Sequence, residues 1–202
     1  MIQILCADIA SADTAVFRRL YERASAQRKL RADGYLLEAD KLRCVTADAL
    51  LKAALGTDGY QVEAGPWGKP RIRDRQDFHY NLSHSGRYVV LAYGSSPVGV
   101  DVQEHRTSVN MDALSARFFT PDEQAYIRQS PQDRFYAVWT GKESYLKYLG
   151  TGLQKRLSSF SLLSLGPDIR WAHRTLPGGY SLSLCAAEPE YTLRLLDVRQ
   201  LL

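Results

Sequence analysis

The sequence predicts an α+β protein built from two consecutive halves. Strand-like stretches flank long helical stretches, and the order strand, helices, strands occurs twice along the 202 residues. Hydrophobic residues make up 45% of the chain, which is enough for the core of one domain or of two small ones. Because no linker-like or low-complexity segment interrupts the chain, we expect two tightly joined halves, 1–97 and 98–202.

The first half is expected to begin with a strand and two helices. The helix over 34–54 has leucines at near-helical spacing and ends before Gly56, which is typical of a helix end. Glycines and prolines then bound short extended pieces, and Ser83–Arg87 is expected to connect two core strands. The expected elements are strand 2–9, helices 13–30 and 34–54, extended pieces 60–64 and 71–73, and strands 78–82 and 88–93.

The second half is expected to begin with a strand over 98–103. Residues alternate there, so Asp101 and Gln103 share one face of the strand while the valines face the other. Thr120 and Pro121 predict the start of a helix, and Pro131 predicts a longer helix that ends at Gly150. The remaining expected strands are 157–163, 169–175, 180–186 and 191–197.

Charge is unevenly distributed along the chain. The net charge is only +4, but between residues 18 and 31 a single acid, Glu22, faces six basic residues. Such a run is either a solvated helix face or a site for an anionic partner. The basic residues are Arg18, Arg19, Arg23, Arg28, Lys29 and Arg31.

The N-terminal residues and the cysteines predict a cytoplasmic protein. The first ten residues lack a basic segment and include Asp8, unlike a signal peptide, and no apolar run approaches the ~18 residues of a membrane span. The three cysteines are scattered without metal-binding or redox spacing, and the four histidines show no ligand spacing either. We therefore expect no membrane association and no zinc.

Two segments predict a magnesium site. Glu143 and Lys147 lie one helical turn apart on a face that is mostly aromatic and apolar, so the pair is expected to line a cleft. The alternative is a surface ion pair of about 0.3–0.5 kcal/mol. Asp101 and Gln103 supply further oxygen atoms, and Mg²⁺ typically takes one or two protein carboxylates beside water and substrate phosphates.

Six short motifs in order resemble the phosphopantetheinyl transferases of the surfactin type. Each motif is weak alone, but their joint order and spacing are specific, and the resemblance covers residues 25 to 165. The motifs are Trp67-Gly68-Lys69-Pro70, Asn81-Leu82-Ser83-His84-Ser85, Val98-Gly99-Val100-Asp101-Val102, Arg117-Phe118-Phe119-Thr120-Pro121-Asp122-Glu123, Trp139-Thr140-Gly141-Lys142-Glu143-Ser144-Tyr145-Leu146-Lys147 and Gly150-Thr151-Gly152-Leu153.

The resemblance implies an α+β pseudo-dimer of two similar halves with its active site in the cleft between them. The implied enzyme is a Mg²⁺-dependent holo-carrier-protein synthase that moves the 4'-phosphopantetheine arm of coenzyme A onto a serine of an apo acyl or peptidyl carrier protein and releases 3',5'-ADP. Asp101 and Glu143 are then metal ligands, for Mg²⁺ or for Mn²⁺ in its place. Glu143 also takes the serine proton, directly or through water, and Lys147 steadies the phosphates.

The resemblance also implies a set of residues that contact coenzyme A. Arg28, Arg31 and Arg43 fall where family members place basic residues near the 3'-phosphate and the adenine. Ser83 and His84 belong to a motif that contacts the 3'-phosphate, although a lone histidine in a turn is ordinarily structural. Lys69 and Pro70 match the nucleotide-contacting loop, but a Gly-Lys-Pro turn is equally common as plain loop structure.

One residue departs from the family pattern. Many relatives carry a second acid two residues after the aspartate, whereas this chain has Gln103, whose amide oxygen can ligate Mg²⁺ but adds no charge. Glu104 is not expected to replace it, because it faces the other side of the strand. The departure bears on metal affinity.

Three rival interpretations stay open at this point. Synthases dedicated to fatty-acid carrier proteins are about half this length and trimeric, whereas a chain with both halves should act as a monomer. A nucleic-acid-binding module would use the basic run, but stacking motifs and fold signatures are missing, so no nucleic-acid partner is expected. A degenerate relative that binds coenzyme A without catalysis is the third. The sequence does not say whether the carrier serves fatty-acid, polyketide or nonribosomal-peptide synthesis.

Overall fold

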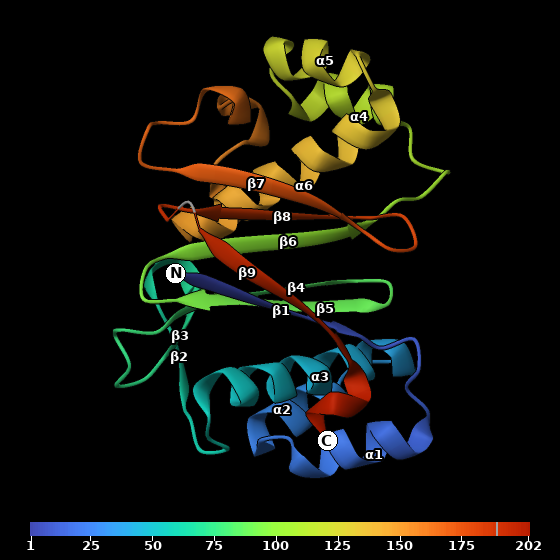
Figure 1. Ribbon diagram of the computed structural model, residues 1–202, viewed down its shortest axis with the longest axis vertical. Helices are drawn as coiled ribbons and strands as arrows, with labels where there is room; N and C mark the ends of the chain where they lie inside the picture. Colours follow the sequence, from blue (N-terminus) through green and yellow to red (C-terminus); the bar gives the residue numbers. More distant parts are fainter. Residues whose placement is uncertain (189) are drawn as a thin grey trace.

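Two β-sheets lie between two groups of helices in the computed structural model, which describes residues 1–188 and 190–202 (Figure 1). Three helices from the early part of the chain cover one end of the molecule, and three later helices cover the other. The mixed α+β class predicted from the sequence is confirmed. None of the helices in the described part of the chain has the length and apolar character of a membrane span.

The first sheet combines three early strands with the last strand of the chain. Its order is β4-β5-β1-β9, with β1 antiparallel to β5 and parallel to β9. The strand β9 belongs in sequence to the segment 98–202, yet it pairs with β1. The strands are β1 (Ile2–Asp8), β4 (His79–Ser85), β5 (Tyr88–Gly94) and β9 (Tyr191–Asp197).

The helices α1 (Thr14–Arg23), α2 (Ala26–Asp33) and α3 (Glu38–Leu55) share a core with one face of this sheet. The single helix predicted over 13–30 is wrong, because the chain breaks at Ser25, which caps α2 by accepting a hydrogen bond from the Arg28 N–H. The break turns α2, with its basic residues, toward α3. The predicted end of the next helix is confirmed by Gly56, in the left-handed conformation at φ +67°.

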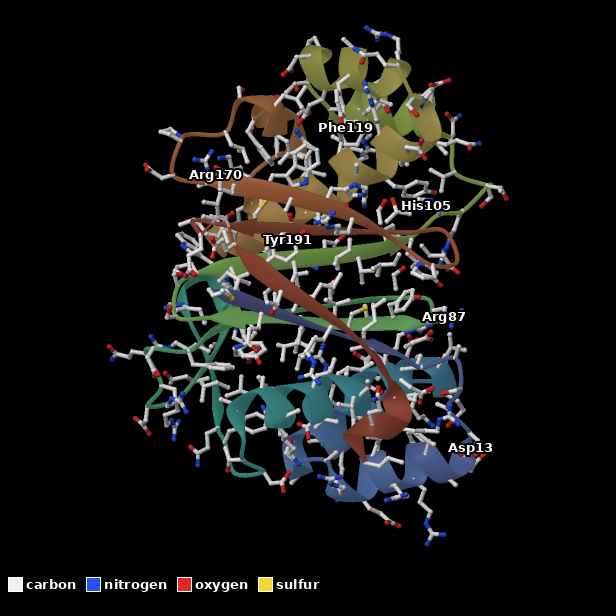
Figure 2. The ribbon with its side chains drawn as sticks, in the orientation of Figure 1. Asp13, Arg87, His105, Phe119, Arg170 and Tyr191 are labelled. Carbon is white, nitrogen blue, oxygen red and sulfur yellow. The ribbon has the colours of Figure 1, made fainter. Side chains whose placement is uncertain are left out.

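The strand β4 is longer than the sequence pattern predicts. It runs through Ser85 and returns into β5 by a two-residue turn, so Ser83 and His84 lie in the strand rather than in the connection. Arg87 of this turn pairs with Asp8 at the end of β1, its Nε 2.8 Å from Oδ1 (Figure 2). Because Ser83 and His84 are consecutive strand residues, their side chains point to opposite faces of the sheet.

Between α3 and β4 the chain forms a small two-stranded sheet. The strands β2 (Val62–Ala64) and β3 (Pro70–Ile72) pair antiparallel around the 3₁₀ turn η1 (Pro66–Gly68). The two short extended pieces predicted from the glycine and proline pattern are thereby confirmed. Trp67 at the tip is 68% exposed.

The second sheet has the order β6-β8-β7 and is antiparallel throughout. The long helix α6 packs on it, and α4 and α5 pack on α6. The elements are β6 (Val98–Glu104), α4 (Met111–Phe118), α5 (Pro121–Arg128), α6 (Pro131–Leu149), β7 (Arg170–Leu176) and β8 (Tyr180–Ala186). The 3₁₀ turns are η2 (Gly152–Gln154), η3 (Leu157–Ser159), η4 (Leu162–Ser164) and η5 (Val198–Leu201).

The strand predicted over 157–163 is wrong, and α4 was not predicted. This segment forms the turns η3 and η4 instead, and Leu162 of η4 and Phe160 between the two turns join the core under α6. The helix α4 is only eight residues long and follows the N-cap Asn110, whose side chain accepts from the Ala113 N–H. The predicted start of α5 is confirmed, with Pro121 as its first residue.

A fully buried ion pair fixes α5 against α6. Lys142 Nζ lies 2.6 and 2.7 Å from the two carboxylate oxygens of Glu123, and both side chains are 0% exposed. Glu123 also accepts from the backbone N–H groups of Thr120 and Leu162. The pair sits in an aromatic environment that includes Phe119, which lies among the helices at the far end of the second sheet (Figure 2).

The two sheets are joined by side chains of β4 that bond to the backbone of β6. Asn81, Ser83 and Ser85 accept hydrogen bonds from the N–H groups of Val100, Val102 and Glu104 at 2.8, 3.2 and 3.0 Å. Every second residue of β4 thus meets every second residue of β6. The β6 valines face inward, against the apolar residues of β1 and β5.

Candidate active site

Asp101 on β6 and Lys147 on α6 form the center of the candidate site. Lys147 Nζ lies 2.7 Å from Asp101 Oδ1 and 3.1 Å from Ser83 Oγ, and it donates to the Val100 carbonyl at 3.2 Å. Ser83 Oγ in turn donates to Asp101 Oδ1 at 2.8 Å. Strand β4, strand β6 and helix α6 therefore meet at one carboxylate.

Helix α6 can approach β6 this closely because β6 contains Gly99. A Cβ atom at this position would lie 2.0 Å from the Ser144 carbonyl oxygen and 2.3 Å from the Tyr148 nitrogen. Any side chain there would separate the strand from the helix. Gly99 thus sets the distance between Asp101 and the helix that carries Lys147.

Glu143 precedes Lys147 by one helical turn and is only partly exposed. Burial raises the pKa of Glu143, the negative charge of Asp101 raises it further, and Lys147 opposes the shift. Lys147 bonds to Asp101 rather than forming the surface pair with Glu143 that the spacing also allowed. The carboxylates of Asp101 on β6 and Glu143 on α6 thus face a common region that holds the ammonium group of Lys147.

Gln103 lies two residues beyond Asp101 on the same face of β6, as the alternation predicted. Its side-chain Nε2 lies 3.4 Å from Ser85 Oγ and donates to the Glu104 carbonyl at 3.2 Å. Glu104 accepts from the Tyr180 hydroxyl on the apolar side of the strand. The amide nitrogen is thus engaged by protein, which leaves the amide oxygen available to a ligand.

A cavity of about 950 Å³ lies between α2, α3 and the first sheet. Five of the seven residues predicted to contact coenzyme A line it: Arg28, Arg31, Arg43, Pro70 and His84. Arg43 Nε donates to the Gly86 carbonyl at 2.8 Å and its Nη1 lies 2.7 Å from Asp40, so this guanidinium is fixed by protein contacts. The cavity wall therefore gathers positive charge from two helices.

His84 links the cavity to the Asp101 cluster. Burial lowers the pKa of His84, and the positive charges of Arg43 and Lys147 lower it further. The ring faces the cavity side of β4, whereas the preceding Ser83 faces Asp101. A neutral His84 at neutral pH can donate one hydrogen bond to an anion without adding charge.

Ser83 and Lys69 do not line this cavity. Ser83 is buried and bonded within the Asp101 cluster. Lys69 Nζ donates to the carbonyls of Val98 and Tyr148 at 3.0 and 3.1 Å, and its side chain lines a second cleft of about 790 Å³. Burial lowers the pKa of Lys69 to about 8. Lys69 thus ties the small sheet to β6 and to the end of α6.

The oxygen atoms of this site fit a hard divalent cation. Two carboxylates that share a partly buried region repel each other, and the raised pKa of Glu143 reflects that repulsion as well as burial. Within residues 1–188 and 190–202, no three His, Cys, Asp or Glu side chains group as a metal cage. Two carboxylates plus an amide oxygen suit Mg²⁺, which keeps water and substrate oxygens in its coordination shell.

The sequence analysis missed the residues that support the site. Asn81 and Ser85 were quoted only as part of a motif, although their alternation with Ser83 on a strand indicates one shared face. Asp48 was missed inside a helix that was assigned mainly from its leucines. The signal for Asp48 was its position four residues from both Cys44 and Lys52, on the buried face of α3.

The basic run between residues 18 and 31 does not form one surface. Arg18 is paired with Glu22 on exposed α1, and Lys29 Nζ donates to the Glu22 carbonyl. Arg28 and Arg31 turn toward the cavity. The run thus divides between a solvated helix face and the concave wall of the cavity.

Comparison with known proteins identifies relatives over most of the chain. The family model described as the 4'-phosphopantetheinyl transferase superfamily matches residues 97–191. A 4'-phosphopantetheinyl transferase of Bacillus subtilis is 32% identical over 197 residues, covering 86% of this chain and 86% of the relative. The 4'-phosphopantetheinyl transferase Sfp of Bacillus subtilis strain 168 is 28% identical over 191 residues, covering 83% and 84%. The 4'-phosphopantetheinyl transferase HetI of Nostoc is 31% identical over 147 residues, covering 65% and 61%.

Proposed function

The chain belongs to the 4'-phosphopantetheinyl transferase superfamily, and we propose that it transfers the 4'-phosphopantetheine arm of coenzyme A to a serine of an apo acyl or peptidyl carrier protein. The products are holo carrier protein and 3',5'-ADP. The observation that carries the proposal is the cluster of Asp101, Lys147 and Glu143 beside a cavity that Arg28, Arg31 and His84 line.

In the proposed reaction the carrier serine oxygen attacks the phosphorus that bears the pantetheine arm. The bond from that phosphorus to the bridging oxygen breaks, and 3',5'-ADP leaves with the bond's electron pair. Glu143 accepts the serine proton, directly or through water. Lys147 donates to the phosphate oxygens on which charge accumulates. Asp101 holds Lys147 in place at 2.7 Å.

Asp101 and Glu143 would hold Mg²⁺, or Mn²⁺ in its place, with the amide oxygen of Gln103 as a neutral third ligand. When bound, the ion supplies positive charge to the pyrophosphate. Arg28, Arg31 and His84 bind the 3'-phosphate, and Arg43 and Pro70 line the nucleotide site. Lys69 and Ser83 act by fixing β6 and α6, because their side chains bond to those elements.

We also propose that 1–97 and 98–202 are related halves of a pseudo-dimer, with β9 of the second half completing the sheet of the first, and that the carrier serine enters the cleft between the halves. All catalytic groups named above come from one chain, which supports a monomer. We propose a cytoplasmic enzyme that acts on neither nucleic acid nor membrane. Sedimentation at several concentrations of the protein tests the monomer.

The proposed reaction is tested by mixing the protein with coenzyme A, Mg²⁺ and a panel of apo carrier proteins and measuring carrier mass. Addition of one phosphopantetheine to the carrier is expected, and the panel identifies its class. Glu143→Gln should lose at least about 100-fold in turnover, since a general base typically contributes that much. Glu22→Gln, an exposed carboxylate on α1, is the matched control. Near-normal turnover by Glu143→Gln would remove Glu143 from the mechanism.

The proposed contacts to the 3'-phosphate are tested by comparing coenzyme A with 3'-dephospho-coenzyme A. Charged hydrogen bonds of roughly 1.5–3 kcal/mol imply that Arg28→Ala or His84→Ala weakens coenzyme A binding about 10- to 100-fold. Binding of the dephospho compound should change little. Equal weakening of both ligands would mean that these residues do not contact the 3'-phosphate.

A further inference from the structure

A carboxylate without a role in the proposed reaction lies directly behind the cavity wall. Asp48 projects from α3, and its side chain is only 1% exposed. A charged side chain at such depth is unfavourable unless it is paired and hydrogen-bonded. The groups that pair with Asp48 therefore indicate why the chain keeps it.

Asp48 binds donors from three separate segments. It accepts from the backbone N–H of Ser25 at 3.3 Å and from the Ser25 hydroxyl at 3.2 Å. The Tyr60 hydroxyl, which precedes β2, donates to Oδ1 at 2.5 Å. Lys52 Nζ, one turn later on α3, lies 3.3 Å from Oδ2. One carboxylate thus joins α3 to the start of α2 and to the segment before β2.

The start of α2 is also where Arg28 is positioned. Ser25 is the N-cap of α2 and accepts from the Arg28 N–H at 3.3 Å, so Asp48 holds the residue that starts this helix. Asp48 Oδ1 lies 3.6 Å from Arg28 Nε, close enough for an ion pair but too long for a hydrogen bond. The Arg28 guanidinium thus has Asp48 behind it and lines the cavity in front.

The charges of this group favour an anion in the cavity. Asp48 supplies one negative charge, and Arg28 and Lys52 supply two positive charges within 3.6 Å of it. Lys52 is also shared with the exposed Asp58, 3.7 Å away, whereas Arg28 rather than Lys52 lines the cavity and presents its positive charge there. Burial and the hydrogen bond to Asp48 raise the pKa of Tyr60, so its hydroxyl stays a donor to that carboxylate.

We propose that Asp48 is a positioning residue for the nucleotide end of coenzyme A. Asp48 fixes Arg28 and Tyr60 on the cavity wall that binds the 3'-phosphate. This inference rests on the proposed transferase function. Asp48 acts through Arg28 and does not touch the substrate. Its loss should therefore raise KM for coenzyme A through the 3'-phosphate alone and leave kcat and KM for the carrier protein nearly unchanged.

The test compares Asp48→Asn with Asp58→Asn, which removes an exposed carboxylate 3.7 Å from the same Lys52. For Asp48→Asn, KM for coenzyme A should rise about 10-fold while KM for 3'-dephospho-coenzyme A and kcat stay within about 2-fold. The control should match wild type. Arg28→Ala combined with Asp48→Asn should differ from Arg28→Ala alone by less than about 3-fold, because both changes remove the same contact.

The proposal would be overturned if Asp48→Asn kept the wild-type ratio of the KM values for coenzyme A and 3'-dephospho-coenzyme A. It would also be overturned if the effect of Asp48→Asn on KM multiplied with that of Arg28→Ala. If Asp48→Asn does not fold, Tyr60→Phe replaces it in the test, because this change removes a single donor to Asp48 and adds no atom. A Tyr60→Phe variant with an unchanged ratio of the two KM values would then count against the proposal. A wild-type protein that neither binds coenzyme A nor modifies any carrier refutes the proposed function and this inference with it. Wild-type transfer with an unaffected Asp48→Asn refutes only the inference.

Discussion

Replacing one member of the buried Lys142–Glu123 pair should destabilise the protein strongly. Both side chains are 0% exposed, so solvent does not screen the pair. Removing one partner of such a pair leaves an uncompensated buried charge, which typically costs about 3–5 kcal/mol. Lys142→Met should fall at the lower end, because Glu123 keeps the N–H groups of Thr120 and Leu162 at 2.9 and 2.8 Å.

Glu123→Gln should cost more than Lys142→Met. The ammonium group would keep the Phe160 carbonyl at 2.6 Å and the Phe160 ring, but no anion. Since small domains are stable by only about 5–15 kcal/mol, either change takes a large share of the total. In the double variant the glutamine oxygen still accepts from a backbone N–H and no charge is buried, so the loss should shrink to about 1–2 kcal/mol.

Urea unfolding of wild type, both single variants and the double variant measures these free energies as a double-mutant cycle. Unchanged m-values would show that unfolding exposes the same surface in all four proteins. The expected result is a double variant more stable than either single variant. Single losses below about 1 kcal/mol, or losses that simply add, would refute the reasoning, because they would mean that the pair is solvated or uncoupled.

Three further predictions concern α6, the metal and pH. Gly99→Ala should destabilise the protein by at least about 1–3 kcal/mol and reduce turnover, because it separates β6 from α6. Gly166→Ala, which has open space around it, should do neither. A stable and active Gly99→Ala variant would contradict the close approach of β6 and α6. Gln103→Glu should lower the Mg²⁺ concentration for half-maximal activity, since it adds a charged oxygen on the Asp101 face; an unchanged titration would mean that position 103 does not face the metal. Burial lowers the pKa of His173, and the charges of His105 and Arg174 lower it further. Because the unfolded chain then binds more protons than the folded chain, the free energy of unfolding should fall as pH drops below about 6.5. His173→Gln should flatten that fall between about pH 7.5 and about pH 5.5 in urea unfolding, and an equal fall in both proteins would exclude His173 as its source.

Residue alternation and helix-cap residues were the most informative patterns of the sequence. Alternation correctly placed Asp101 and Gln103 on one face of β6, and the cap residues correctly started α5 and ended α3. The segment 157–163 was wrongly predicted as a strand, because packing of Phe160 and Leu162 under α6 accompanies 3₁₀ turns there. Long-range packing, which the sequence does not display, decides that case.

The residue types of the candidate site stood out in the sequence, but the contacts between them in the folded chain did not. The spacing of Glu143 and Lys147 suggested a mutual pair, whereas Lys147 bonds to Asp101 on a strand 46 residues earlier. Ser83 and His84 were grouped by one motif, and the strand sends them to opposite faces. The spacing of Asp48 to Lys52 was visible in the sequence, but its bonds to Ser25 and Tyr60 were not, because these segments meet Asp48 only in the folded chain. The metal ligands and the coenzyme A contacts stay predictions.

The hydrogen bonds that Asn81, Ser83 and Ser85 accept from β6 protect its exposed edge from pairing with another chain. β6 is the last strand of its sheet, and such a strand ordinarily presents a row of free N–H groups that can recruit a strand from another molecule. Here the three β4 side chains occupy that row. A chain divided between residues 97 and 98 would uncover it. The piece 98–202 made alone should therefore aggregate through β6, and the intact chain carries its own protection against self-association at this edge.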